Sequence, residues 1–174
     1  MNKIINLGDL LDSQKDAHKI AIIDLSGHEP RSFSFKQIDE MACALAESLK
    51  ERGLPDKSPI ALLGPNSAEF FVSYLAVLKA GYTALLLNYK LPQQPLQKIL
   101  TDSDCKLIFC DADRISSCPQ NIPVINLNHD LKNIRPSVNF KSYHPTADDI
   151  AFCLYTSGAG GKPKGVTVSH KAHA

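Results

Sequence analysis

The spacing of hydrophobic residues changes repeatedly along the chain. Residues 38–49 carry apolar side chains every three to four positions, which predicts an amphipathic helix that stops at Gly53 and Pro55. Short apolar runs, too short for helices, predict strands buried on both faces. These runs are residues 59–64, 83–88 and 106–111. Because such strands alternate with helical segments, the pattern predicts an α/β fold of alternating helices and mostly parallel strands.

Weaker patterns extend this alternation at both ends of the chain. Asn66 or Ser67 is placed to cap a helix that ends at Gly81. The other predicted segments are helical patterns over 4–11 and 92–101 and strand patterns over 19–25, 33–35, 124–127, 150–157 and 166–170, with His170 at the start of a further helix. Four prolines interrupt residues 114–148. We therefore divide the chain into an α/β layer (1–112), an irregular connection (113–148) and a strand–loop–strand unit (149–174).

Composition narrows the class of protein. The chain has 174 residues, of which 44% are hydrophobic and 21% charged, as expected for one globular domain. Its 19 basic and 18 acidic residues give a net charge of +1, so no strong field favours nucleic acid or an anionic membrane. The first residues, MNKIINLGDLLDS, do not resemble a signal peptide, and no apolar run is long enough to span a bilayer. We expect a cytoplasmic protein without integral membrane association.

Cysteine, histidine and aspartate spacing gives no metal or disulfide pattern. The five cysteines contain no CxxC pair, so we interpret them as small buried apolar residues; a reactive thiol would need a nearby basic group or helix start. The six histidines show no ligand spacing and are expected at the surface or at helix caps. Four aspartates flank the predicted strand 106–111, where we expect them to solvate its ends and not to act as an acid/base pair: Asp102, Asp104, Asp111 and Asp113. No metal site is predicted.

The stretch YTSGAGGKPKGV, residues 155–166, is the strongest candidate site. Glycine can adopt positive φ and turn successive N–H groups toward one point, which binds anions such as phosphate. The donors would be the amides of Gly158, Gly160 and Gly161, the hydroxyls of Thr156 and Ser157, and the ammonium groups of Lys162 and Lys164. The alternative from these residues alone is a flexible surface hairpin with solvated lysines. Neither the Walker A pattern nor GxGxxG fits, because Pro163 follows Gly161-Lys162.

Three blocks in the same order resemble the adenylate-forming superfamily of acyl-CoA synthetases, nonribosomal adenylation domains and luciferases. YTSGAGGKPKGV is similar to the family signature YTSGTTGxPKGV. Residues 75–111 resemble the segment around LKAGxxxxPLN, and residues 32–54 resemble the first core region. The resemblance implies the first subdomain of the large N-terminal domain of these enzymes. The segment LLNYKLP, residues 86–92, is more similar to acid:CoA ligases than to nonribosomal domains.

The resemblance implies a chemistry and a set of binding residues. Family members use ATP and Mg²⁺ to convert a small-molecule carboxylic acid into acyl-AMP, then transfer the acyl group to a thiol, here CoA or the phosphopantetheine of a carrier protein. By position, phosphate would be held by Thr156, Ser157, Gly158, Ala159, Gly160, Gly161 and Lys164. Lys162 occupies a variable family position and is expected to be solvated. The family's magnesium-binding glutamate and catalytic lysine lie beyond this loop, so we expect no catalytic or metal-binding residue in this chain.

Two departures from the family pattern lead to alternatives. Ala159 and Gly160 stand where the family has hydroxyl residues, so two side-chain donors to phosphate are missing. The chain also ends at Ala174, whereas family members have several hundred residues. We expect an inactive N-terminal piece of an acid:CoA ligase. The alternatives are part of an adenylation domain that loads a carrier protein, or a truncated paralogue that binds nucleotide or a partner without catalysis.

Overall fold

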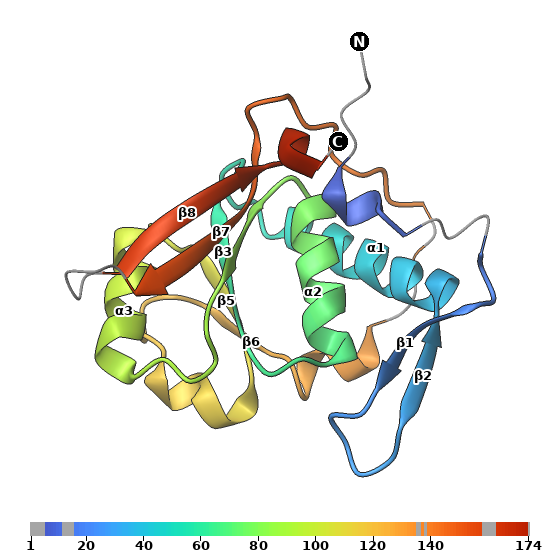
Figure 1. The fold of residues 1–174 in the computed structure, drawn as a ribbon, viewed down its shortest axis with the longest axis horizontal. Helices are drawn as coiled ribbons and strands as arrows, with labels where there is room; N and C mark the ends of the chain where they lie inside the picture. Colours follow the sequence, from blue (N-terminus) through green and yellow to red (C-terminus); the bar gives the residue numbers. More distant parts are fainter. Residues whose placement is uncertain (1–5, 12–15, 135–136, 138, 158–162, 174) are drawn as a thin grey trace.

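A six-stranded sheet forms the centre of the molecule (Figure 1). The computed structural model describes residues 6–11, 16–134, 137, 139–157 and 163–173. The strand order is β6-β5-β3-β4-β7-β8, and every neighbouring pair is parallel except β7 and β8, which are antiparallel. The strands are β3 (Pro59–Leu63), β4 (Thr83–Leu86), β5 (Leu107–Cys110), β6 (Val124–Asn126), β7 (Ile150–Ser157) and β8 (Pro163–Ser169).

Helices cover both faces of the central strands, which are therefore buried on both sides. In β3, Ile60 and Leu62 point into a core formed with α1 (Phe35–Glu51) and α2 (Ala68–Lys79). Ala61 and Leu63, on the opposite face, belong to a second core with α3 (Gln93–Asp102). The continuous apolar runs in the sequence therefore follow from two-sided burial.

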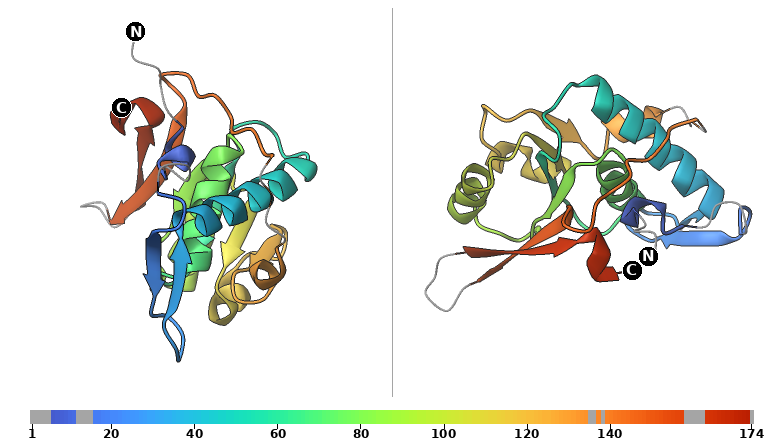
Figure 2. Two further views of the ribbon diagram at one scale, coloured as in Figure 1. Left: turned by 90° about the vertical axis from the view of Figure 1, so that its right-hand side faces the viewer. Right: turned by 90° about the horizontal axis from the view of Figure 1, so that it is seen from above.

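A separate antiparallel pair, β1 (Ile20–Asp24) and β2 (Arg31–Ser34), lies outside the main sheet next to α1 (Figure 2). Short 3-10 helices complete the described chain: η1 (Leu7–Asp9), η2 (Ala112–Ser117), η3 (Asp130–Asn133) and η4 (His170–His173).

Local hydrogen bonds define the helix starts. At α1, the Ser34 side chain accepts from the Gln37 N–H at 3.2 Å, and the Gln37 side chain accepts from the Ser34 N–H at 2.8 Å. At α2, Ser67 is the cap and accepts from the Phe70 N–H at 3.1 Å. These side chains satisfy N–H groups that have no partner within the helix, which is why the two helices begin where they do.

The expected α/β class and its mostly parallel sheet are confirmed, with two differences at the ends of the chain. The helical pattern over 4–11 becomes only the three-residue η1, and residues 4 and 5 lie outside the described residues. The strand expected at 166–170 instead covers Pro163–Ser169, because backbone pairing with β7 extends it toward the loop. Proline and glycine are disfavoured within strands, so Pro163 and Gly165 gave no sign of this extension in the sequence. His170 begins η4, a 3-10 helix.

Candidate functional site

The β7–β8 hairpin carries the glycine-rich segment. Thr156 pairs with Lys164 and Ser157 with Pro163 across the two strands, so the candidate residues on either side of the loop are brought together. The side chain of Lys164 is exposed. The remaining candidates, Gly158, Ala159, Gly160 and Gly161, together with Lys162, lie outside the described residues. The described part of this segment is thus the antiparallel pair of β7 and β8, and the glycine-rich residues connect the end of β7 to the start of β8.

The loop follows the carboxyl end of β7, and β7 is the parallel neighbour of β4. Ligands in open α/β sheets bind beyond the carboxyl ends of the strands, where the connecting loops gather. The segment after β4, residues 88–92, begins near this same edge. Its Asn88 and Lys90 side chains are exposed, and the Asn88 Oδ1 accepts from the Lys90 N–H at 2.9 Å.

Polar contacts hold the segment after β4 in place. The Tyr89 hydroxyl donates to the Asp111 Oδ1 at 3.2 Å. The Arg114 guanidinium donates to the Tyr89 carbonyl and, at 2.6 Å, to the Leu91 carbonyl. Asp111 is 7% exposed and caps η2 through the Asp113 N–H, so it is a buried structural carboxylate instead of a solvated strand end.

Gly165 allows β8 to approach β7 closely. A Cβ at this position would lie 3.0 Å from the Cys153 Sγ and 3.2 Å from the Tyr155 Cζ. Sequence reasoning gave Gly165 no role, although a glycine inside a strand signals a close approach of neighbouring atoms. On the α3 side of β7, a cavity of about 360 Å³ is lined by residues that include Thr83, Leu85, Cys153 and Tyr155.

Asp149 fixes the start of β7. Its carboxylate, 6% exposed, pairs with the Lys57 Nζ at 2.6 Å and accepts from the Tyr143 hydroxyl and the Thr146 N–H, both at 2.8 Å. Burial alone would raise the pKa of Asp149, but the hydrogen bonds from Lys57, Thr146 and Tyr143 hold this pKa below its usual range. The strand leading to the loop is therefore anchored by a carboxylate that stays charged.

His170, which follows β8, is buried, so of the two expected places for a histidine it does not occupy the surface. It is 2% exposed, and its Nδ1 accepts from the Leu7 N–H at 3.1 Å. Burial lowers the pKa of His170, although the charges of Asp149 and Asp9 act in the opposite direction. This contact joins the described N-terminal residues to the end of the hairpin, 163 positions away, which local sequence patterns cannot indicate.

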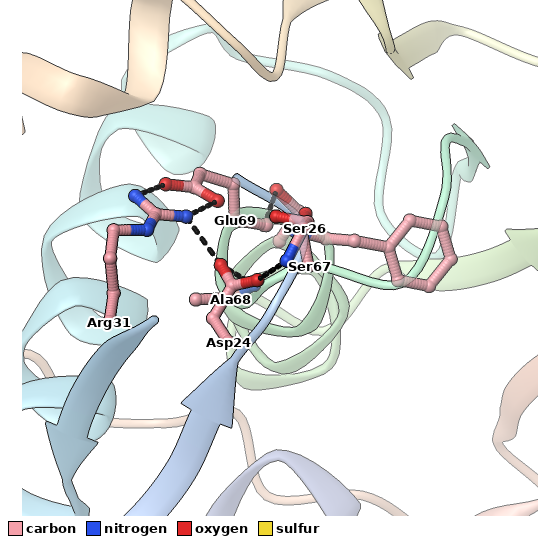
Figure 3. A network of polar contacts seen from close by, with 8 residues as sticks. Asp24, Ser26, Arg31, Ser67, Ala68 and Glu69 are labelled. Carbon is pink, nitrogen blue, oxygen red and sulfur yellow. Dashed lines mark hydrogen bonds and ion pairs between the residues drawn. The ribbon is translucent and has the colours of Figure 1, made fainter. Parts of the chain in front are cut away.

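A second polar cluster joins the β1–β2 pair to the start of α2 (Figure 3). Asp24 accepts from the Ser26 N–H at 2.8 Å and the Ala68 N–H at 3.1 Å, and it pairs with Arg31. Arg31 also forms a bidentate pair with Glu69 at 2.7 and 2.8 Å. Burial alone would raise the pKa of Asp24, but hydrogen bonds from Ser26, Ala68 and Arg31 lower it overall.

The cluster around Asp24 is structural. A cavity of about 480 Å³ beside it extends over the carboxyl ends of β3, β5 and β6 and is lined in part by Arg31 and Glu69. A helix N-terminus can bind an anion, but at α2 the buried Asp24 carboxylate already occupies that position. Arg31 and Glu69 are likewise paired with each other, so we assign no ligand to this cavity.

Among the residues that the structure describes, no group of three or more histidine, cysteine, aspartate or glutamate residues could hold a metal ion. Within the same residues, none of the helices combines the length and apolar character needed to cross a membrane.

Comparison with known proteins tests the resemblance inferred from the sequence. The profile of the AMP-binding enzyme family matches residues 12–174. The chain belongs to this AMP-binding enzyme family. Among curated relatives, tyrocidine synthase 2 of Brevibacillus parabrevis is 33% identical over 84% of the chain, and tyrocidine synthase 1 of the same organism is 30% identical over 97%. The chain spans only 4% and 16% of these two proteins.

Solved structures of similar proteins support the AMP-binding fold. The N-terminal subdomain of NpsA from Klebsiella oxytoca superimposes with a TM-score of 0.80 at 25% identity, covering 97% of this chain and 43% of that one. The O-succinylbenzoate coenzyme A synthetase MenE of Bacillus subtilis, solved with AMP, gives 0.76 at 26% identity, covering 90% of this chain and 40% of that one. The expected superfamily and fold are confirmed.

Proposed function

We propose that this chain is the N-terminal part of an AMP-forming ligase that activates a small carboxylic acid as acyl-AMP, using ATP and Mg²⁺. The observation that carries the proposal is the glycine-rich segment between β7 and β8 at the carboxyl end of the sheet, in a chain of the AMP-binding enzyme family. The three-part division at residues 112 and 148 and a cytoplasmic location belong to the same proposal.

In this proposal the loop stabilises charge. When the carboxylate attacks the α-phosphate of ATP, negative charge builds on the departing pyrophosphate, and fixed N–H donors lower the energy of that state. The donors are the main-chain amides of residues 157–161 and the Lys164 ammonium, with the hydroxyls of Thr156 and Ser157. Mg²⁺ would neutralise further phosphate charge, and its glutamate ligand would come from outside this chain.

The acceptor thiol has two candidates. The LLNYKLP segment, anchored at the carboxyl edge by Arg114, favours CoA by its resemblance to acid:CoA ligases. The tyrocidine synthases and NpsA, which has been solved as an artificial adenylation–PCP fusion with ThdA, favour the phosphopantetheine of a carrier protein. We propose CoA as the acceptor and a carrier thiol as the second candidate.

Titration calorimetry of this chain with ATP and Mg²⁺ tests the phosphate loop. We expect weak binding, because Ala159 and Gly160 lack hydroxyl donors. Lys164→Ala should weaken it about tenfold or more, since a hydrogen bond to a charged group contributes about 1.5–3 kcal/mol. Lys162→Ala, the matched control, should leave binding unchanged. Equal effects of the two substitutions would contradict the assignment, and submicromolar binding by the unaltered chain would favour a dedicated nucleotide-binding module.

The missing donors can be restored. The double substitution Ala159→Thr and Gly160→Thr should tighten ATP binding at least about tenfold, because each new hydroxyl can add a hydrogen bond to phosphate. The same calorimetric titration measures the change. Unchanged or weaker binding would mean that these two positions do not face the phosphates.

The reaction is tested separately. We expect this chain alone to be inactive in acid-dependent ATP–pyrophosphate exchange, and the full-length protein to be active. Product analysis with CoA and, in parallel, with a phosphopantetheinylated carrier domain then identifies the acceptor. Acyl transfer to the carrier but not to CoA would overturn the first candidate in favour of the second.

A further inference from the structure

Two cysteines lie next to each other in the second core. Cys110 is the last residue of β5 and is fully buried, and Cys118, directly after η2, is 8% exposed. Their sulfur atoms are 3.6 Å apart and hydrogen-bonded. Because seven residues separate them, the spacing does not match CxxC, and the pair could not be recognised from the sequence.

The surroundings of the two thiols differ. Cys118 also contacts the Arg114 carbonyl at 3.7 Å, and Cys110 contacts the Asp111 carbonyl at 3.3 Å. The hydrogen bond with Cys110 lowers the pKa of Cys118, and the positive charge of Arg114 acts in the same direction against burial. The same hydrogen bond and burial raise the pKa of Cys110. Cys118 is therefore the thiol that more readily becomes a nucleophilic thiolate, and it is also the more exposed of the two.

We propose that Cys110 and Cys118 are a redox modification site that forms a reversible disulfide when the protein meets hydrogen peroxide. The Cys118 thiolate attacks one peroxide oxygen, the O–O bond breaks, and the released hydroxide takes up a proton to form water. The Cys110 sulfur then attacks the Cys118 sulfenic acid, the S–O bond breaks, and a second water leaves with the Cys110 proton. Two thiols are oxidised by two electrons and one peroxide is reduced.

Through η2, the Cys110–Cys118 disulfide would affect contacts at the carboxyl edge of the sheet. Arg114, within η2, holds the carbonyls of Tyr89 and Leu91, and the Ser117 carbonyl accepts from the Gln97 side chain at 3.4 Å. A disulfide between β5 and the residue after η2 ties these contacts to the sheet. This inference does not depend on the proposed ligase function.

Peptide mapping tests the bond directly. The chain is treated with dilute hydrogen peroxide, alkylated and digested with trypsin without reduction. We expect the intact mass to fall by about 2 Da, the two hydrogens lost on disulfide formation. Residues 107–114 and 115–132 should appear as one linked species, because trypsin cleaves after Lys106, Arg114 and Lys132. Dithiothreitol should separate them again.

Variants make the test specific. Cys118→Ser should abolish the linked species, and Cys110→Ala should do the same, with circular dichroism confirming that each variant is folded. Cys153→Ser, the matched control in β7, should leave it intact. The proposal is overturned if peroxide leaves both thiols free, if Cys118 gains oxygen without forming a link, or if Cys118 links to Cys105, which trypsin places in residues 99–106.

Discussion

Two glycines end helices in the same way but have different surroundings. Gly53, after α1, has φ +63° and no heavy atom within 4 Å of a Cβ built on it. Gly81, after α2, has φ +80°, and such a Cβ would lie 2.6 Å from the Cγ of the Tyr143 ring. Both positions therefore favour glycine for its backbone, whereas Gly81 also needs the absence of a side chain.

This difference predicts unequal effects of the same substitution. Gly53→Ala should lower the free energy of unfolding by about 1–2 kcal/mol, the cost of left-handed backbone for an L-residue. Gly81→Ala should lower it by about 2–5 kcal/mol, because overpacking against Tyr143 adds to that cost. Urea denaturation of the two variants measures both values. Equal losses would show that the Tyr143 ring moves aside freely.

His170 gives the stability of the fold a pH dependence. Its pKa is lowered in the folded chain, so the unfolded chain binds more protons near and below its ordinary pKa of about 6.5. The contribution of neutral His170 is thus present above about pH 6.5 and is lost as the pH falls, by up to about 1.4 kcal/mol per unit. Denaturation between pH 7.5 and 5.5 should show this slope, and His170→Asn should reduce it.

The control is His28→Asn, at an exposed position in the turn after β1. It should keep the slope of the unaltered chain, because the contact between His170 and the Leu7 N–H remains. The charged neighbours Asp149 and Asp9 pair with Lys57 and Lys79 and favour protonation of His170. If His170→Asn leaves the slope of stability against pH unchanged, neutral His170 does not stabilise the fold through its contact with η1.

At the scale of elements, Asp24 connects three pieces of structure. It ends β1, caps the first N–H group of α2 and pairs with Arg31 of β2. A two-stranded antiparallel pair is marginally stable by itself, so its position beside α1 depends on such contacts. The side chain of Asp24 is only 2% exposed, which makes the pair with Arg31 much less screened than a surface ion pair.

Asp24→Asn should therefore be costly. We expect a loss of about 2–4 kcal/mol in the free energy of unfolding, since a charge-assisted network loses its buried carboxylate. Asp16→Asn, which removes the exposed pair with Lys19, should change it by less than about 1 kcal/mol. The lowered pKa of Asp24 stabilises the fold above its unfolded value of about 3.9, and this contribution is lost as the pH falls. The asparagine variant should consequently show a shallower acid transition, and a stability equal to the Asp16 variant would contradict the role of Asp24.

At the scale of the molecule, two cores share one sheet. Side chains of β3 alternate between the core under α1 and α2 and the core under α3. Because the same strands form both cores, we expect them to unfold together. Buried Cys43 of α1 and buried Cys105 beside α3 report on the two sides.

Thiol labelling across a urea series tests this cooperativity. Cys43 and Cys105 lie in separate tryptic peptides, so mass spectrometry can follow each one. Both should become reactive at the same urea concentration, matching the far-ultraviolet circular dichroism transition. Separate midpoints would show that the core under α3 opens independently.

Sequence patterns predicted most elements and part of the candidate site. The strands β3, β4 and β5 were recognised because a strand buried on both faces has a continuous apolar run. Ser67, one of the two expected caps, and the glycines that end α1 and α2 were recognised because their chemistry is local. The pairing of Thr156 with Lys164 was not predicted, since an antiparallel register depends on contacts between strands.

By itself, the sequence determined the order of helices and strands, the family and the identity of the phosphate-loop candidates, because these depend on local composition and motifs. Only the tertiary structure decided that His170 is buried against η1, that Asp24 occupies the N-terminus of α2, and that Cys110 lies beside Cys118. The physical reason is the same in each case: a pKa, an ion pair or a thiol contact depends on distance and burial, which arise when distant segments pack together.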